Sequence, residues 1–148
     1  MRSLRQLLDD ICIEKEGVDM TLNELSGVVV DAAFEVRRTV GIGLLESAYE
    51  AALARELSLR GIEVKRQVPV FMQYKGADIG EAYRIDMLID DRLIVECKAT
   101  EANKPVFAAQ CLTYLRAKGL SLGLVINFGC LMLKNGIERV VNNFKEDG

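Results

Sequence analysis

The chain has 148 residues, half of them hydrophobic, and a formal net charge of -3 at pH 7. This amount of apolar material supports one globular domain with a proper core and excludes a disordered chain. The absence of histidine from the sequence excludes a histidine general base, a Ser-His-Asp triad and a His-bearing zinc site. Any metal must therefore be bound mainly by oxygen, which favours Mg²⁺ or Mn²⁺.

The four cysteines show no C-x-x-C spacing, and three of them lie in apolar runs. We therefore expect reduced, buried thiols in a cytoplasmic protein. Residues 1–20 are weakly patterned and are treated as an N-terminal extension with a short helix. Asp9 and Asp10 interrupt its apolar residues before a secretory segment is long enough, and no later stretch approaches about 18 uninterrupted apolar residues. We therefore expect no export signal and no membrane span.

The folded domain is expected to span residues 21–148 and to begin with a helix over about 22–40. Apolar side chains recur there every three or four residues, and Thr21 or Asn23 can cap the first turn. The stretch Gly41-Ile42-Gly43 ends this helix, because glycine is a poor helix former.

A second helix is expected from about Leu44 to Arg60, with Gly61 at its C-terminal end. Its apolar stripe consists of Leu45, Ala48, Tyr49, Ala52, Leu53 and Leu57. Glu46, in the first turn, stands at the head of the line through Tyr49 and Leu57. We therefore expect the Glu46 carboxylate on the inward edge of the helix.

The pattern changes to strands between Ile62 and Ala99. A turn at Lys75-Gly76 ends the first run, in which Pro69 indicates an edge strand or a bulge. Two further runs, Ile85 to Ile89 and Leu93 to Ala99, are expected to form a hairpin.

This hairpin carries charged side chains where a buried pair of strands should have none. Glu96 and Lys98 interrupt an aliphatic run two residues apart and therefore point the same way, and Asp86 lies in the preceding run. An acid on one strand and Glu-x-Lys on the next can hold a divalent cation beside a lysine. The alternative is an ion pair on a half-exposed strand, which would contribute little to stability.

The loop between the two strands decides whether a metal site can form. A two-residue turn at 90–91 would place Asp86 opposite Val95, so that Asp86 and Glu96 would face opposite sides of the sheet. A three-residue loop at 90–92 would instead place Asp86 directly across from Glu96. The metal hypothesis requires the second register.

A third helix is expected from about Pro105 to Lys118, with Gly119 beyond it. Its core stripe is predicted to consist of Ala108, Cys111, Leu112 and Leu115. Gln110 and Tyr114, four residues apart, lie together on a neighbouring stripe with Phe107.

The last part of the chain is again typical of strands. Leu122 to Asn127 is apolar enough for a central strand. The stretch 131–141 predicts a hairpin, with strands over 131–134 and 137–141 and a two-residue turn at Asn135-Gly136. The order of elements favours an α/β fold with one mixed sheet flanked by helices.

The motif Gly43-Leu44-Leu45-Glu46-Ser47-Ala48-Tyr49 resembles the one that gives the GxxExxY proteins their name, a branch of the PD-(D/E)XK nuclease superfamily. The similarity covers about residues 22–142 and continues through Arg60-Gly61-Ile62, Gln67-Val68-Pro69, Arg84-Ile85-Asp86, Glu96-Cys97-Lys98-Ala99, Ala109-Gln110 and Ile126-Asn127-Phe128. It implies a restriction-endonuclease-like core, in which a helix, a three-stranded meander, a helix and a further strand follow one another. The chain departs from the family at Arg37 or Arg38 and at Phe107, where relatives tend to have histidine, and at Ile42, where proline is usual.

The resemblance implies roles for the charged residues of the hairpin and for Glu46. Asp86 and Glu96 would bind Mg²⁺ or Mn²⁺ together with the backbone carbonyl of Cys97. Lys98 would orient or activate the attacking water, and Glu46 would complete the site directly or through water.

Three further residues are expected to contact the substrate. Gln110 and Tyr114 resemble the Q-x-x-x-Y pair of a nuclease subgroup, in which this helix contacts the scissile strand; the alternative is an ordinary helix flank with a tyrosine in the core. Arg84 is expected to share a strand face with Asp86 and to bind the nucleic acid.

We therefore expect a metal-dependent nuclease that hydrolyses phosphodiester bonds in nucleic acid, with DNA as the favoured substrate. The alternative is a non-catalytic nucleic-acid-binding or regulatory module that retains the nuclease fold. The net charge of -3 speaks against a broad electrostatic contact with nucleic acid. The small, acidic chain is therefore expected to bind DNA weakly or to need a partner, either another protein or a second copy of itself.

Overall fold

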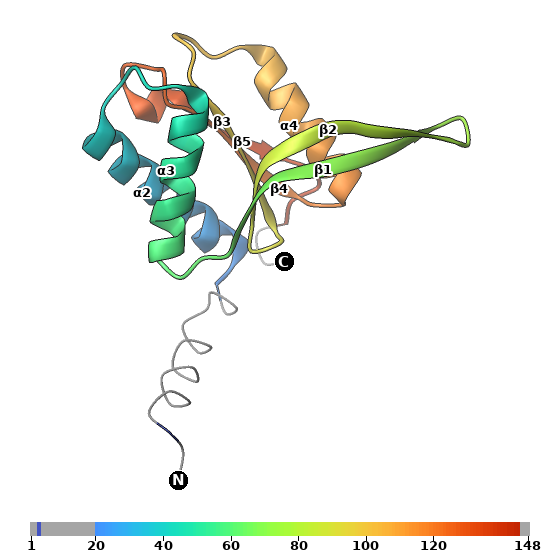
Figure 1. Cartoon of the computed structure of the whole chain (residues 1–148), viewed down its shortest axis with the longest axis horizontal. Helices are drawn as coiled ribbons and strands as arrows, with labels where there is room; N and C mark the ends of the chain where they lie inside the picture. Colours follow the sequence, from blue (N-terminus) through green and yellow to red (C-terminus); the bar gives the residue numbers. More distant parts are fainter. Residues whose placement is uncertain (1–2, 4–19, 146–148) are drawn as a thin grey trace.

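The computed structural model describes Ser3 and residues 20–145, and it shows a five-stranded sheet flanked by helices (Figure 1). The elements of this part of the chain are α2 (Leu22–Val40), α3 (Glu46–Leu59), β1 (Val64–Tyr74), β2 (Ala77–Ile89), β3 (Leu93–Lys98), α4 (Pro105–Lys118), β4 (Leu122–Asn127), the 3₁₀-helix η2 (Leu133–Gly136) and β5 (Ile137–Val141). None of these helices has the length and apolarity that a membrane span needs. The short helix expected in the N-terminal extension lies outside the described residues.

The strands follow one another across the sheet in chain order, from β1 at one edge to β5 at the other. The pair β3–β4 is parallel and the other pairs are antiparallel. A parallel pair needs a crossover connection, which α4 provides. Helices α2 and α3 cover one face of the sheet and α4 covers the other (Figure 1). The predicted mixed α/β sheet is therefore confirmed.

Helix α2 begins with a capping box. The Glu24 N–H donates to Thr21 Oγ1 at 3.1 Å, and the Thr21 N–H donates to Glu24 Oε1 at 3.5 Å. This exchange satisfies backbone donors that the first helical turn leaves open. Of the two caps considered from the sequence, Thr21 is the one used, and the helix ends at Gly41 as expected.

Helix α3 begins two residues later than expected. Leu45 is the extended N-cap residue and is 77% exposed, so its predicted place in the apolar stripe is wrong. The buried residues Tyr49, Leu53 and Leu57 confirm the rest of the line, but Glu50 is buried with them. A carboxylate at a buried position needs a partner.

The hairpin of β1 and β2 is longer than the sequence indicated and projects beyond the rest of the molecule (Figure 1). Its turn lies at Lys75-Gly76, as predicted, with Tyr74 paired to Ala77 and both turn residues at positive φ. Strand β1 lies at the edge of the sheet, which agrees with Pro69, since proline cannot donate a ladder hydrogen bond.

The loop between β2 and β3 has three residues. Ile89 pairs with Leu93, and the Arg92 N–H donates to the Ile89 carbonyl oxygen at 2.9 Å. Asp90 and Asp91 both have left-handed backbone conformations, with φ of 52° and 55°. The structure therefore has the register that the metal hypothesis requires.

Helix α4 has the predicted bounds but a different buried stripe. The buried residues are Phe107, Cys111 and Leu115, which are spaced four apart and face the sheet, whereas Ala108 and Leu112 are only half-buried. Three of the cysteines, Cys97, Cys111 and Cys130, are buried free thiols, as expected. Cys12 lies outside the described residues.

The hairpin expected over residues 131–141 is wrong in its first half. Strand β4 is buried along its whole length and β5 pairs with it, but 131–134 forms no strand and Leu131 is 87% exposed. Residues 133–136 form η2 instead. A Cβ on Gly136 would lie 2.3 Å from the Asn127 carbonyl oxygen, so this glycine serves a close approach rather than a two-residue turn.

Asn127, at the end of β4, ties this strand to the loop between β3 and α4. Its Oδ1 accepts the N–H groups of Thr100 and Gly129, both at 3.0 Å. Its Nδ2 donates to Thr100 Oγ1 and to Asn103 Oδ1, both at 3.1 Å. These bonds fully satisfy a buried amide and fix the loop that follows the Glu-x-Lys strand.

Replacement of Gly129 is expected to destabilise this junction. In Gly129→Ala the new Cβ would lie 2.3 Å from the Thr100 carbonyl oxygen, so the loop must shift, and the free energy of unfolding should fall by about 1–3 kcal/mol. Gly27→Ala is the control, because nothing lies within 4 Å of a Cβ placed there. Alanine is also a better helix former than glycine at this exposed position of α2. Urea denaturation of both variants measures the effect, and equal stabilities would contradict the close packing at Gly129.

Candidate active site

Asp86 on β2 and Glu96 on β3 each bind the backbone of the other strand. The pairing of these strands includes Met87 opposite Val95, so Asp86 stands opposite Glu96. There the Asp86 N–H donates to Glu96 Oε1 at 3.0 Å, and the Cys97 N–H donates to Asp86 Oδ2 at 2.9 Å. The two carboxylates predicted to share one ion therefore lie together.

The electrostatics of this pair favour a bound cation. Glu96 is 3% exposed, and its burial, followed by the charge of Asp86, raises the pKa of Glu96 to about 9. Two like charges in a poorly solvated place disfavour each other's ionised form. A divalent cation beside them would compensate both the burial and the repulsion.

Lys98, the last residue of β3, is half-buried beside α4. Its Nζ donates to Gln110 Oε1 at 3.4 Å and lies 5.0 Å from the centre of the Phe107 ring. The ring face attracts the ammonium group, and the amide oxygen orients it. The structure thus brings Lys98 and Gln110 together, and it adds Phe107 as the surface beneath the lysine.

Glu46 lies in the first turn of α3, near the pair but more exposed than either member. Partial burial raises the pKa of Glu46; Lys98 opposes this rise, and the charges of Asp86 and Glu50 add to it. Among the described residues, no three His, Cys, Asp or Glu side chains lie close enough together to bind a metal ion. The structure therefore brings two carboxylates together and does not bring Glu46 in as a third.

The remaining predicted substrate contacts fall in two places. The Tyr114 ring stacks on Tyr83 with centroids 4.6 Å apart, and burial, followed by the charges of Glu96 and Asp86, raises the pKa of Tyr114 to about 12. Arg84 lies exposed on the projecting hairpin and forms an ion pair with Glu81. Tyr114 thus lies near Asp86 and Glu96. The ion pair of Arg84 with Glu81, in contrast, lies within β2 of the projecting hairpin.

Sequence reasoning missed a second polar cluster, which contains Glu50, Arg66 and Gln67. Glu50 Oε2 accepts from Arg66 Nε at 3.1 Å and from Arg66 Nη2 at 2.8 Å, and Glu50 Oε1 accepts from Gln67 Nε2 at 2.9 Å. The one available signal was an acidic residue directly after Tyr49 on the inward side of a helix. Nothing in the sequence pointed to the stacking of Tyr83.

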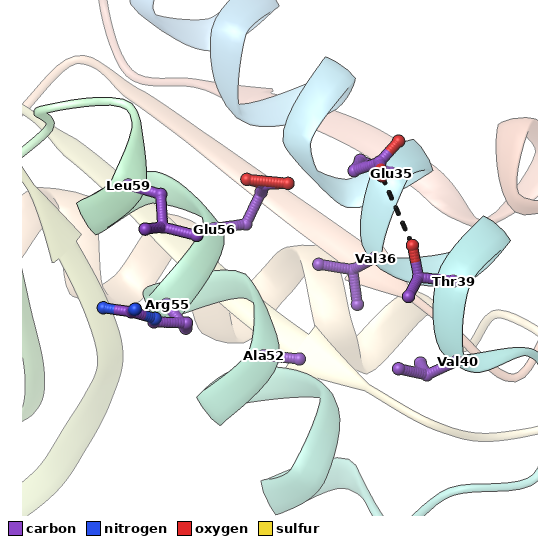
Figure 2. Close-up of a pocket in the computed structure, with 8 residues that line it drawn as sticks. All are labelled: Glu35, Val36, Thr39, Val40, Ala52, Arg55, Glu56 and Leu59. Atoms are coloured by element: carbon purple, nitrogen blue, oxygen red, sulfur yellow. Dashed lines mark hydrogen bonds between the residues drawn. The ribbon is translucent and has the colours of Figure 1, made fainter.

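Two hollows lie near α3. One, of about 220 Å³, lies between the α2–α3 connection and the β3–α4 loop, and is lined by Ile42, Gly43, Leu44, Tyr49, Ala99, Thr100, Glu101 and Gly129. The other, of about 190 Å³, lies between α2 and α3 (Figure 2) and is lined by Glu35, Val36, Thr39, Val40, Ala52, Arg55, Glu56 and Leu59. Neither hollow is lined by a predicted site residue, but the first includes Ala99, which directly follows Lys98 at the end of β3.

Comparison with protein families matches residues 23–140 to the PD-(D/E)XK nuclease superfamily. Comparisons with curated proteins and with solved structures found no significant match. The matched region extends from α2 into β5 and includes Asp86, Glu96 and Lys98. The sheet, its flanking helices and the acidic pair beside a lysine agree with this match. The chain belongs to the PD-(D/E)XK nuclease superfamily.

Proposed function

We propose that the protein is a metal-dependent nuclease of the GxxExxY branch that hydrolyses phosphodiester bonds in nucleic acid, with DNA as its substrate. The observation that carries this proposal is the contact of Asp86 and Glu96 at the point where the β2–β3 ladder ends, with Lys98 on the same strand. The motif from Gly43 to Tyr49 supports the branch.

The residues at this point suit Mg²⁺ or Mn²⁺. Asp86, Glu96 and the carbonyl oxygen of Cys97 would hold the ion, with water in the remaining positions and Glu46 acting through water. Hard oxygen ligands of this kind are those that both ions prefer. When bound, the ion would activate water and stabilise the negative charge that develops on the phosphoryl group.

The protein's own side chains would position the reacting groups. Lys98 can donate a hydrogen bond to the nucleophile or to a phosphate oxygen without occupying a metal position. Gln110 accepts a hydrogen bond from the Lys98 ammonium group and orients it. Tyr114, one turn further along α4, would contact the scissile strand together with Gln110. Helix α4 would therefore face the substrate, while α2 and α3 support the sheet from its other face.

The metal site predicts that Mn²⁺ binds to the wild type and that Asp86→Ala weakens this binding by more than about tenfold. Asp86 would supply a carboxylate to the ion, and its carboxylate also accepts the Cys97 N–H. Isothermal titration calorimetry on the purified proteins measures the difference. Asp31→Ala is the control, because it removes an exposed carboxylate that pairs with Arg60 on the helical side. Equal affinities in Asp86→Ala and the wild type would remove the site.

A Mg²⁺-dependent cleavage assay with a mixed panel of DNA and RNA substrates tests the activity itself. The second candidate, a non-catalytic nucleic-acid-binding module, is favoured by the absence of a three-side-chain metal cluster among the described residues. Nucleic-acid binding without cleavage in any of the substrates would support this second candidate. Cleavage that disappears when EDTA removes the ion would support the nuclease.

A further inference from the structure

Gln67, on β1, has a backbone conformation that a residue with a side chain rarely adopts. Its φ is 53°, in the left-handed region, although it lies within a strand. The pairs Arg66–Met87 and Val68–Ile85 flank it, so Gln67 stands opposite Asp86 across the hairpin. The strained position therefore adjoins the first residue of the acidic pair.

The hairpin rotates about its long axis at this position. Met87 and Ile89 pack in the core under α2 and α3, whereas Ile85 packs in the core under α4. Ile85 and Met87 would share a face in a regular strand, because side chains alternate. The alternation therefore breaks at Asp86. Figure 1 shows the distal part of the hairpin projecting away from the rest of the sheet.

Glu50 binds the side chain of Gln67. The Gln67 side-chain amide donates to Glu50 Oε1 at 2.9 Å, while Arg66 binds the other carboxylate oxygen at 2.8 Å. Glu50 is 6% exposed and lies on α3, one turn after Glu46. Charge-assisted hydrogen bonds to a buried carboxylate are strong enough to offset a strained backbone conformation.

We propose that Gln67, held by Glu50, is a positioning residue for Asp86. The left-handed turn at Gln67 lets β1 follow β2 through the rotation, and this rotation directs the Asp86 carboxylate to Cys97 and the Asp86 N–H to Glu96. This inference rests on the proposed function, since it names the element that brings the two metal-binding carboxylates together. Gln67 would act through Asp86 and not by a contact of its own with the ion or the substrate.

Two substitutions of the same residue separate the backbone role from the loss of a contact. Gln67→Ala removes the hydrogen bond to Glu50 but keeps a Cβ that disfavours positive φ. Gln67→Gly removes the same bond, yet glycine adopts this conformation freely. We expect Gln67→Ala to weaken Mn²⁺ binding by about 5- to 30-fold, and Gln67→Gly to stay within about threefold of the wild type.

A second measurement works on the metal-free protein. The amide protons of Asp86 and Cys97 donate to carboxylates, so their NMR signals report the geometry of the pair. Both signals should move in Gln67→Ala and stay near their wild-type positions in Gln67→Gly. Thermal unfolding of each variant establishes that it is folded under the conditions of the measurement.

The outcomes separate this inference from the proposed function. Unchanged Mn²⁺ affinity and unchanged amide signals in Gln67→Ala would overturn the positioning role. Equal losses in the alanine and glycine variants would also overturn it, because the backbone conformation would then not matter. If the wild type binds no Mn²⁺, the proposed function fails, and the amide signals of the metal-free proteins alone decide whether Gln67 positions Asp86.

Discussion

The Lys98→Ala variant is expected to cleave nucleic acid about 10²- to 10³-fold more slowly than the wild type while keeping its melting temperature. Lys98 Nζ lies at the end of β3, 3.4 Å from Gln110 Oε1, and its strand is the one that carries Glu96. A donor at this position would act on charge that develops in the transition state, so its removal should affect the rate and leave the fold intact. Single-turnover cleavage with Mg²⁺ and a thermal unfolding curve measure the two effects.

Lys118→Ala is the matched control for this experiment. It removes the same charge from the exposed last turn of α4, away from the acidic pair, and should change neither cleavage nor melting temperature. The alternative considered from the sequence, a structural ion pair of Glu96 with Lys98, makes the opposite prediction. A lower melting temperature with cleavage retained in Lys98→Ala would support that alternative and contradict the catalytic role.

The Leu115→Ala variant is expected to lose about 2–5 kcal/mol of unfolding free energy. Leu115 has no exposed surface and packs between α4 and the sheet, in the same cluster as Ile94 and Val125. Its Cδ1 would lie 3.5 Å from a Cβ placed on Gly123, so the side chain fills the space above β4. Truncation would leave a cavity that these strands cannot close. Urea denaturation followed by circular dichroism gives the difference.

Leu112→Ala provides the comparison on the same helix. Leu112 belongs to the stripe predicted from the sequence, but it is only half-buried, so its truncation should cost about 1 kcal/mol. Both variants remove the same atoms and keep a good helix former in place. Equal losses of stability would therefore contradict the burial pattern of α4, whatever the function of the protein.

Much of the architecture follows from local sequence signals. Thr21 with Glu24 begins α2, and Pro105 with Gly119 bounds α4, because caps and helix breakers act within a few residues of themselves. The periodicity of apolar residues likewise predicted α2, and the continuous apolar run from Leu122 to Asn127 predicted the buried strand β4. These signals need no knowledge of the rest of the chain, and the order of elements they define is enough to predict the mixed sheet.

Other features were underdetermined because they depend on what packs against them. Asn135-Gly136 has the composition of a hairpin turn, yet Gly136 is required because the Asn127 carbonyl oxygen approaches it closely. Phe107 was assigned to the flank of α4, but in the folded protein it is buried together with Cys111 and Leu115. The same local sequence is compatible with both the predicted and the observed arrangement, and the surface that packs against it decides which one forms.

The site at Asp86 and Glu96 was likewise determined partly by the sequence and partly by the tertiary structure. The sequence identified Asp86 and Glu96 as carboxylates that can hold an ion beside Lys98. Strand alternation alone places Glu96 and Lys98 on one face. The sequence allowed two registers for the loop that precedes them, and one of these would have separated the carboxylates. Tertiary structure decided between them by pairing Ile89 with Leu93. It also supplied the contact of Glu50 with Gln67, because hydrogen bonds between a helix and a distant strand exist only after the chain has folded.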